Sequence, residues 1–440
     1  MLMLVRGGRV IDPGNIDGIM DILIDNGKIV EIKPQIVAEG SAGLQTGAPG
    51  TERGKVSVDR VIDAGGKIVT PGLIDMHVHL REPGYEYKET IATGCKSAAC
   101  GGFTAVCCMP NTNPVNDNRQ VTEFILKRAL EVDTVRVYPV AAISSGLQGK
   151  GLCEYGDLKD AGAVAFSDDG NPVMDSQLMR RALEYAKGFG LLVISHCEDR
   201  DLAGGGVMNE GEIATRMGLA GIPNAAESVM VIRDIALCEL TQSPLHIAHV
   251  STAESVRAIR DAKNRGVLVT AETAPHYFTL TDEAVGAYDT NAKMNPPLRS
   301  RLDREAVRQG LADGTIDVIA TDHAPHARIE KEVEFDLAAN GIIGLETSLS
   351  LSLKLVDDGL LALTDLIAKM STNPARILGL ESGLDVGRHA DITIIDPDRP
   401  YRIEADNFQS LGRNTPFNGW DVKGRAILTM VGGKVVYQDQ

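Results

Sequence analysis

The sequence predicts an α/β protein with a (β/α)8 barrel and a small composite β-domain made from both ends of the chain. Two observations predict the barrel: eight short apolar runs recur along the middle of the chain, and amphipathic stretches separate them. A third is that acidic or histidine residues stand where several runs end, as in barrels whose sites gather at the carboxyl ends of the strands. An open, doubly wound sheet is the alternative architecture.

Short β-like runs separated by Gly, Asp and Asn turns occupy the beginning and the end of the chain. Residues 1–71 and 386–440 are therefore expected to form the composite β-domain, around a barrel of residues 72–385. The glycine-rich segment 37–55 has no apolar period, which predicts a mobile surface loop.

The apolar runs of the middle region are the predicted barrel strands. They occupy residues 72–79, 104–110, 135–143, 163–169, 191–198, 245–251, 267–274 and 317–325. The segment 174–190 (MDSQLMRRALEYAKGFG) has apolar residues three and four apart, which predicts one of the intervening helices.

Composition and charge narrow the classes of function. A formal net charge of -16 argues against a nucleic-acid or anionic-membrane partner, and an anionic substrate would need local positive charge for its capture. Seven cysteines without a C-x-x-C pair fit a reduced, cytoplasmic location. Because no apolar stretch approaches the ~18 residues of a membrane span, we expect a soluble protein.

Histidines and acids at the run ends predict a metal site. His77 and His79 are two residues apart in a strand, so both project to the same side, and imidazole suits zinc. Similar residues end the fourth, fifth, sixth and eighth runs: Asp168 with Asp169, His196, His249 and Asp322. All would lie at one face of a barrel, which predicts a joint metal site.

Strand alternation distinguishes ligands from neighbouring residues. His246 and His249 are three apart and are expected to face opposite sides, which favours His249 as the ligand and a structural role for His246. By the same rule one of Asp168 and Asp169 points into the barrel mouth, and alternation leaves open which. His276 follows the seventh run and is expected to be a core or supporting histidine.

Motifs along the whole chain carry a family resemblance. They are DMHVHLREPG (75–84), MPNTNPV (109–115), FSDDG (166–170), SHCED (195–199), NEGEIATRMGLAGIPNAAES (209–228), HIAHVST (246–252), KMNPPLR (293–299), ATDHAPH (320–326), GLETSL (344–349) and RNTPFNGW (413–420). The chain resembles the amidohydrolase superfamily and, within it, is similar to bacterial dihydroorotases that use no carboxylated lysine.

The resemblance implies two zinc ions per subunit, with Asp169 rather than Asp168 as the bridging carboxylate. Its histidine ligands are His77 and His79 for the first ion and His196 and His249 for the second. Asp322 would complete the first zinc shell and also act as the general acid/base.

The resemblance also implies a set of substrate contacts. They are Arg81, Asn111 and His326 around the substrate carboxylate, Asn295 at the ring, and Asn340 with Gly341 in a loop, and the metal ligand His79 is a further substrate contact. Asn340 differs from the more apolar residue expected there, which leaves that contact open.

The implied reaction is the reversible cyclisation of N-carbamoyl-L-aspartate to L-dihydroorotate in pyrimidine biosynthesis. An allantoinase or dihydropyrimidinase would share the fold and metals, but those families usually bridge their metals with a strand-four lysine, and AVAFSDDG (163–170) contains none. A non-catalytic homologue would typically have lost ligands. A homo-oligomer is expected, and a subunit active only in complex with aspartate transcarbamoylase is a further alternative.

Overall fold

The computed structural model describes residues 1–40 and 56–439. Most of the predicted loop over 37–55 lies outside the described residues. At its edges, β4 (Ala38–Gly40) pairs in parallel with β5 (Val56–Val58). The expectation of a loop is therefore wrong for residues 38–40.

Eight parallel strands form the barrel in chain order, each paired with the next. They are β8 (Leu73–Val78), β9 (Phe103–Cys108), β10 (Arg136–Ala141), β11 (Ala165–Ser167), β12 (Leu192–Ser195), β15 (Leu245–Ile247), β16 (Val269–Thr273) and β17 (Val318–Ile319). A parallel bridge between Val78 and His323, just beyond β17, brings the first and last strands together. The predicted barrel is confirmed, and the open-sheet alternative is wrong.

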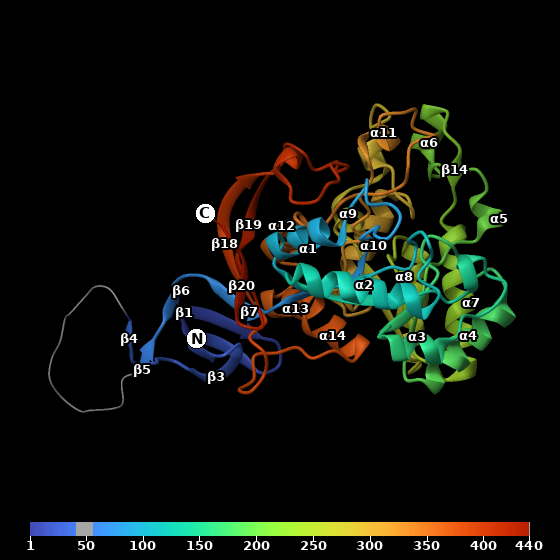
Figure 1. Cartoon of the computed structure of the whole chain (residues 1–440). Helices are drawn as coiled ribbons and strands as arrows, with labels where there is room; N and C mark the ends of the chain where they lie inside the picture. Colours follow the sequence, from blue (N-terminus) through green and yellow to red (C-terminus); the bar gives the residue numbers. More distant parts are fainter. Residues whose placement is uncertain (41–55, 440) are drawn as a thin grey trace.

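Helices surround the barrel strands (Figure 1). The main ones are α1 (Ile91–Cys100), α2 (Arg119–Val132), α3 (Tyr155–Ala161), α4 (Ser176–Gly188), α7 (Ala225–Thr241), α8 (Ala253–Asn264), α10 (Arg301–Ala312), α12 (Ser348–Asp357), α13 (Leu363–Met370) and α14 (Thr372–Leu378). The helix predicted within 174–190 is α4.

Shorter elements lie in the connections between the barrel strands and in the C-terminal region. They are α5 (Arg200–Ala203), β13 (Met208–Asn209), α6 (Glu212–Met217), β14 (Gly221–Ile222), α9 (Pro275–Thr279), α11 (Arg328–Lys331) and 3-10 turns at Ser145–Leu147, Asp282–Val285, Thr290–Ala292 and Ala405–Asn407. Because loops after barrel strands commonly build the active site, these insertions mark the functional end of the molecule.

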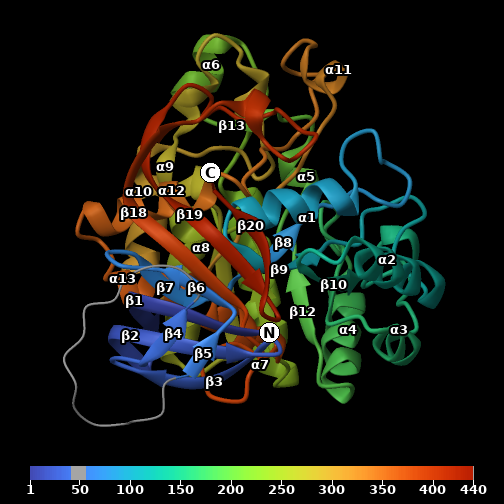
Figure 2. The ribbon, with the colours of Figure 1, turned by 60° about the vertical axis from the view of Figure 1, so that its left-hand side comes forward.

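The two ends of the chain share one sheet, in the order β20-β19-β18-β7-β1-β2-β3, with β6 paired to β1. Its strands are β1 (Leu2–Asp12), β2 (Ile16–Asp25), β3 (Lys28–Lys33), β6 (Arg60–Asp63), β7 (Ile68–Pro71), β18 (Ile392–Arg402), β19 (Asp421–Val431) and β20 (Lys434–Gln438). Figure 2 shows the C-terminal strands beside the N-terminal ones, joined through the antiparallel pair β7 and β18. The predicted composite β-domain is confirmed.

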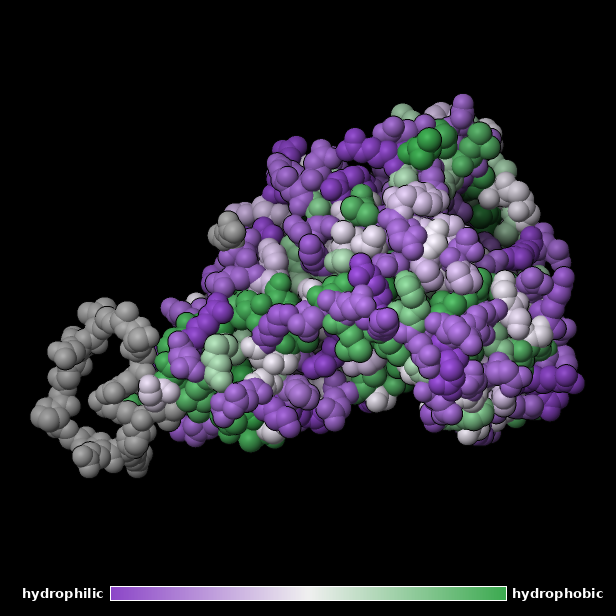
Figure 3. Space-filling view, viewed as in Figure 1, coloured by the Kyte–Doolittle hydropathy of each residue, from purple (hydrophilic) through white to green (hydrophobic). Residues whose placement is uncertain are grey.

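Two layers of apolar side chains hold the barrel together. An inner cluster, including Met76, Val140 and Ile194, fills the barrel, and a larger one lies between the strands and the helices. Hydrophilic residues cover much of one face, with apolar areas between them (Figure 3). Among the described residues, no helix is long and apolar enough to cross a membrane.

The fully buried carboxylate of Asp75 fastens the first strand to the last. Its Oδ1 accepts hydrogen bonds from the backbone N–H groups of His77 and Thr321, both at 3.1 Å. Burial raises the pKa of Asp75 to about 7. Beside the single bridge between Val78 and His323, these bonds close the barrel where the regular pairing is sparse.

Replacing Asp75 by Ala should leave two buried N–H donors without an acceptor and lower the free energy of unfolding by roughly 2–4 kcal/mol. Chemical denaturation of the full chain, followed by circular dichroism, measures this loss. As a control, Asp63→Ala removes an exposed carboxylate that accepts a hydrogen bond from the backbone N–H of Gly65 in a nearby turn, and should change stability by less than about 0.5 kcal/mol. Equal losses in the two variants would contradict the closing role of Asp75.

Candidate metal centre

The carboxyl ends of the barrel strands bring the six predicted metal ligands together. They are His77, His79, Asp169, His196, His249 and Asp322, and all are buried. Their atoms form two groups that could each hold a metal ion, His77 with His79 and His196 with His249, and Asp169 belongs to both groups. Within each group the ligand atoms lie within 4.8 Å of one another.

In the first group two carboxylates face two imidazoles. His77 Nε2 is 3.3 Å from Asp169 Oδ1, and His79 Nε2 is 3.4 Å from Asp169 Oδ2. Asp322 Oδ1 lies 3.1 Å from His79 Nε2 and 3.5 Å from His77 Nε2. This arrangement can offer one cation two imidazole nitrogens and two carboxylate oxygens.

The second group lies on the other side of the same Asp169 oxygen. Asp169 Oδ1 is 3.4 Å from His249 Nε2 and 3.5 Å from His196 Nδ1. The two histidine nitrogens are themselves 2.7 Å apart. One carboxylate therefore reaches both histidine pairs, which is the geometry of a bridging ligand.

The residues fit a divalent metal. Buried polar atoms normally have a hydrogen-bond partner, but His77 Nε2 and Asp169 Oδ1 find none among the described residues. Both are atoms of the type that binds zinc and related ions. The orphaned atoms of this centre therefore point to a cation as their missing partner.

Burial and the neighbouring histidines have opposite effects on the pKa values of the acids of this centre. Burial alone would raise the pKa of Asp169, but His77, His196 and His249 hold it well below its usual value. The pKa of Asp322 is likewise lowered by His77 and His79 against the effect of burial. Both carboxylates are therefore anionic at neutral pH and able to bind a cation.

Local backbone conformation, rather than strand alternation, aims two of the ligands. His249 and Asp322 follow the ends of β15 and β17 and have positive φ angles of 34° and 48°. The prediction that His246 and His249 face opposite sides is wrong, because the turn at His249 brings its ring 5.4 Å from that of His77. His246 lies on the same interior side and contacts Glu272.

The geometry separates the two adjacent aspartates that alternation left open. Asp168 accepts hydrogen bonds from the backbone N–H of Ser144, at 2.9 Å, and from its hydroxyl. It therefore ties the end of β10 to the end of β11 and takes no part in the histidine cluster. Asp169 is the one that points into the barrel mouth.

Glu272 is a participant that the sequence reasoning missed. Its Oε1 lies 2.5 Å from His77 Nδ1, and its Oε2 lies 3.3 Å from His246 Nε2. A carboxylate that accepts from one ring nitrogen of a histidine directs the other nitrogen to a metal. The available clue was a glutamate inside the otherwise buried strand β16.

Asn111 orients His79, the second histidine of the first group, in the same way. Its amide oxygen lies 2.9 Å from His79 Nδ1, so it can accept the ring N–H and leave Nε2 free to face Asp322. This position is compatible with a substrate contact through the amide nitrogen. The sequence reasoning had expected the substrate contact alone.

The remaining predicted substrate residues lie around the mouth. Buried Arg81, whose pKa is lowered by burial, donates from Nε to the carbonyl of Pro325 at 3.2 Å. His326 follows Pro325 in the sequence, and its Nε2 lies 2.8 Å from the backbone carbonyl oxygen of Asn340. Asn295 has a buried side-chain oxygen without a partner among the described residues, although its amide contributes to the pKa of Glu198.

The loop at Asn340 and Gly341 is held by its backbone. The carbonyl of Asn340, rather than its side chain, contacts His326, so this contact tolerates the unexpected side chain. Gly341 has a φ of 152°, and a Cβ there would lie 2.7 Å from the carbonyl oxygen of Ala324. Close packing therefore restricts this position to glycine.

Lys331, a second residue that the sequence reasoning missed, supports this loop. Its buried ammonium donates to the carbonyls of Ala339 at 2.7 Å and Gly341 at 3.2 Å. Burial lowers the pKa of Lys331 to about 7. His276, expected in the core, is indeed buried, and burial lowers its pKa to about 4.

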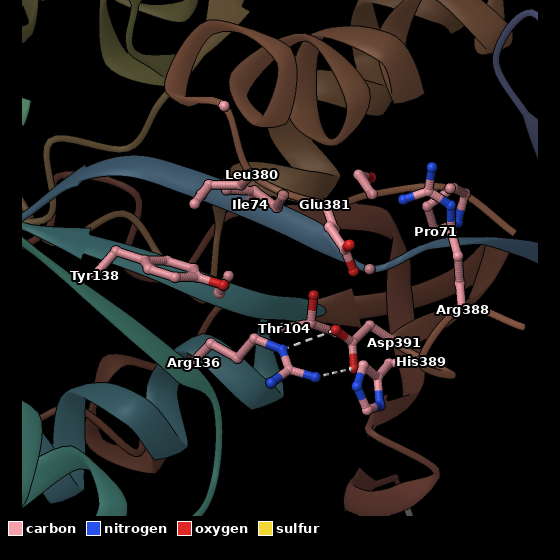
Figure 4. A pocket seen from close by; sticks show the side chains of 15 residues that line it. Pro71, Ile74, Thr104, Arg136, Tyr138, Leu380, Glu381, Arg388, His389 and Asp391 are labelled. Carbon is pink, nitrogen blue, oxygen red and sulfur yellow. Dashed lines mark hydrogen bonds and ion pairs between the residues drawn. The ribbon is translucent and has the colours of Figure 1, made fainter. Parts of the chain in front are cut away.

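A separate cavity of about 370 Å³ lies at the opposite end of the barrel strands (Figure 4). It is lined by Pro71 and Gly72, by residues near the beginnings of β8, β9 and β10, and by residues within 379–391. Arg136 and Asp391 form an ion pair there, with Nε and Oδ2 2.9 Å apart. None of the predicted site residues lines this cavity, so the candidate chemistry belongs to the barrel mouth.

Comparisons with known proteins match this chain to one group of enzymes. Residues 66–255 match the Dihydro-orotase-like family, and residues 211–437 match the Amidohydrolase family. The chain is 60% identical to a dihydroorotase of Syntrophus aciditrophicus (strain SB), over 100% of both chains. It is 58% identical to a dihydroorotase of Geobacter sulfurreducens (strain ATCC 51573 / DSM 12127 / PCA), over 99% of both.

Solved structures share the architecture. The L-hydantoinase (dihydropyrimidinase) from Arthrobacter aurescens superposes with a TM-score of 0.85 at 27% identity, covering 99% of this chain and 96% of that one. The D-hydantoinase (dihydropyrimidinase) from Thermus sp. gives 0.80 at 26% identity, covering 99% and 95%. The fold of this chain is therefore shared with these proteins over nearly its full length.

Replacing Glu272 by Gln should weaken metal retention by roughly 10- to 100-fold, because an amide holds the His77 N–H less strongly than a carboxylate. Zinc remaining after dialysis against graded chelator concentrations measures the effect. Glu346→Gln is a matched control, since Glu346 is a half-buried carboxylate that bonds to Ser97 and the backbone of Gln409. Similar metal loss in both variants would contradict the supporting role of Glu272.

Proposed function

The chain belongs to the dihydroorotase family of the amidohydrolases, and we propose that it uses its metal centre to interconvert N-carbamoyl-L-aspartate and L-dihydroorotate in pyrimidine biosynthesis. The observation that carries the proposal is the buried Asp169 carboxylate, within 3.5 Å of both histidine pairs. Dihydroorotases about 60% identical over the full chain support this substrate.

Two zinc ions are the proposed metals. His77, His79 and Asp322 would hold one and His196 with His249 the other, while Asp169 would bind both. When bound, zinc lowers the pKa of a water molecule to roughly 7 and polarises a carbonyl group. A donor set made of histidine nitrogens and carboxylate oxygens supports a divalent ion of this kind.

Asp322 is the proposed proton carrier. Its carboxylate is anionic because the neighbouring histidines lower its pKa, so it can accept a proton from the attacking water at the start of ring opening. It then delivers that proton to the ring nitrogen as the amide bond breaks. In ring closure the same oxygen takes the proton from the attacking nitrogen.

Arg81, Asn111 and His326 are the proposed holders of the substrate carboxylate. Arg81 supplies a planar fork of donors beside the metal ligands, and Asn111 can donate from its amide nitrogen while its oxygen holds His79. With the metal, this positive region offsets the repulsion between an anionic substrate and a chain of net charge -16. Asn295, Asn340 and Gly341 would contact the rest of the substrate.

A dihydropyrimidinase or hydantoinase activity is the second candidate, supported by the structural neighbours. The substrates dihydrouracil and hydantoin lack the carboxylate that Arg81 would bind, so a substrate panel distinguishes the two. Purified chain reconstituted with zinc should turn over dihydroorotate far faster than dihydrouracil, hydantoin or allantoin. Faster turnover of dihydrouracil would contradict the proposal.

Seven free cysteines support a cytoplasmic, reducing location.

The same activity assay tests whether the chain needs a partner enzyme. The isolated chain should be active, because its buried ligands are positioned by its own barrel. Activity that appears only after addition of aspartate transcarbamoylase would instead identify a subunit that depends on that partner.

Asp169→Ala should abolish turnover and release at least one zinc ion, because it removes the carboxylate between the two histidine pairs. Asp168→Ala is the matched control and should lower stability while retaining both ions, since the Asp168 carboxylate accepts hydrogen bonds from Ser144 in the connection after β10. Metal content and turnover should be measured together. Greater zinc loss in the Asp168 variant, or reactivation that requires bicarbonate, would contradict Asp169 as the bridge.

Lys331→Met should raise the KM for dihydroorotate by roughly tenfold with zinc content unchanged, because it releases the carbonyls of Ala339 and Gly341. Lys369 offers a matched control, as a buried lysine that donates to the carbonyl of Ile316 at 2.6 Å. Lys369→Met should lower stability and leave KM near the wild-type value. Equal KM changes in the two variants would show a general effect of removing a buried lysine.

A further inference from the structure

The mouth of the barrel is bordered by a segment of the composite β-domain. Residues 410–414 belong to the connection between β18 and β19, which extends from the β-domain toward α11 (Figure 1 and Figure 2). None of these residues is a proposed metal ligand or substrate contact. They lie beside residues 322–326, the loop after β17 that carries the proposed proton carrier Asp322 and the carboxylate holder His326. A segment from outside the barrel can therefore set the geometry of this loop.

Asn414 holds one end of the loop through its side-chain amide. Its Oδ1 accepts a hydrogen bond from the backbone N–H of His326 at 3.0 Å. Its Nδ2 donates to the carbonyl oxygens of Ala324 at 2.9 Å and Gly341 at 3.0 Å. Asn414 is buried, and its amide offers the acceptor and the two donors that these backbone groups require. It therefore fixes His326 against the loop at Gly341.

The histidine after the proton carrier is held at the other end of the loop. His323 Nδ1 accepts from the backbone N–H of Gly344 at 3.2 Å, so its Nε2 carries the proton and donates to Glu89 Oε2 at 3.3 Å. Glu89 also accepts from the hydroxyl of Ser410 and, at 3.2 Å, from the backbone N–H of Leu411. Both Glu89 and His323 are buried. The Glu89 carboxylate therefore joins residues 410–414 to the loop through one imidazole.

The position of Asp322 depends on this imidazole. Asp322 has a φ of 48°, in the left-handed region that residues with a side chain rarely adopt, so its neighbours must hold the backbone there. The next residue, His323, is anchored by its ring and by its carbonyl, which accepts from the N–H of His79 at 2.9 Å. Releasing the ring would let the backbone relax and move the Asp322 carboxylate away from His79 Nε2, which lies 3.1 Å from it.

We propose that Asn414 and the pair Glu89 and His323 are positioning residues, through which the composite β-domain sets the geometry of the loop 322–326. The inference rests on the proposed function for the roles of Asp322 and His326. Proton transfer occurs only on the way to the transition state, so displacing Asp322 lowers kcat. Binding of the substrate carboxylate is shared by the ground state and the transition state, so displacing His326 raises KM. The two sets of contacts therefore have different kinetic signatures.

Asn414→Asp tests the contacts at His326. It keeps the shape and the acceptor Oδ1, but it replaces two N–H donors by an oxygen that faces two carbonyl oxygens. The KM for dihydroorotate should rise at least about tenfold, with kcat within about threefold of the wild-type value. Asn414→Ala, which adds no charge, should change KM in the same direction.

Asn373→Asp is the matched control for this variant. Asn373 donates from Nδ2 to the carbonyl of Asp317 at 2.9 Å, just before the same strand β17 but at the end remote from the mouth. The control should leave both kinetic constants unchanged, because it acts on the strand and not on the loop after it.

His323→Phe keeps an aromatic ring in the buried site and removes its hydrogen bonds. The kcat should fall about 100-fold, with KM within about threefold of the wild-type value. Glu89→Gln, which exchanges one oxygen for an amide nitrogen, should show the same split with a smaller loss. Because Glu89 acts through His323, the double variant should be no slower than His323→Phe alone, whereas independent defects would multiply.

Zinc content and circular dichroism are measured for every variant, and kinetic constants are taken with zinc at saturation. If the substrate panel identifies another cyclic amide, the same constants are measured with it, so that failure of the proposed function leaves this test intact. An unchanged KM in the Asn414 variants, equal changes of kcat and KM in the Glu89 variant, or losses that multiply in the double variant would each overturn the inference. Loss of zinc that accounts for the lower kcat would also overturn it.

Discussion

The burial of like charges at one end of the barrel is the constraint on which the rest of the structure depends. Asp169, Asp322 and Glu272 lie together in an interior where an unpaired carboxylate is costly. Histidines surround all three, and the orphaned atoms of His77 and Asp169 still lack a partner among the described residues. A divalent cation would satisfy these atoms, so the requirement that buried charges be paired also accounts for the proposed chemistry.

Much of this arrangement could be predicted from sequence because strand ends in a barrel converge. The apolar runs located the strands, and the residues at their ends, including His77, His196 and Asp322, therefore had to meet. Alternation failed at His249, because it assumes extended backbone and that residue has a positive φ. Alternation could not choose between Asp168 and Asp169, and the family resemblance supplied the choice. The physical reason is the pair of hydrogen bonds from Ser144 to Asp168, which come from another strand end and which no local pattern reveals.

Supporting residues were harder to predict than ligands, for a physical reason. Glu272 contacts His77 and His246 on other strands, and Lys331 contacts the backbone carbonyls of Ala339 and Gly341 in the loop that follows it. Their chemistry becomes apparent only when burial is known, because an exposed glutamate or lysine needs no partner. The sign that such a residue has a supporting role is that its charge is buried, and burial is known only once the fold is known.

Helix α7 holds, through acidic side chains of its inner face, the segments that carry two of the candidate ligands. Asp234 accepts from the hydroxyl of Ser195, next to His196, at 2.6 Å. Glu227 accepts from the backbone N–H groups of Ser251 and Thr252, just after His249, at 3.1 and 3.0 Å. Both histidines of the second pair are therefore flanked by segments that carboxylates of this one helix hold in place. A substitution on the inner face of α7 can act on the metal centre without touching a ligand, because it releases the backbone that positions His196 or His249.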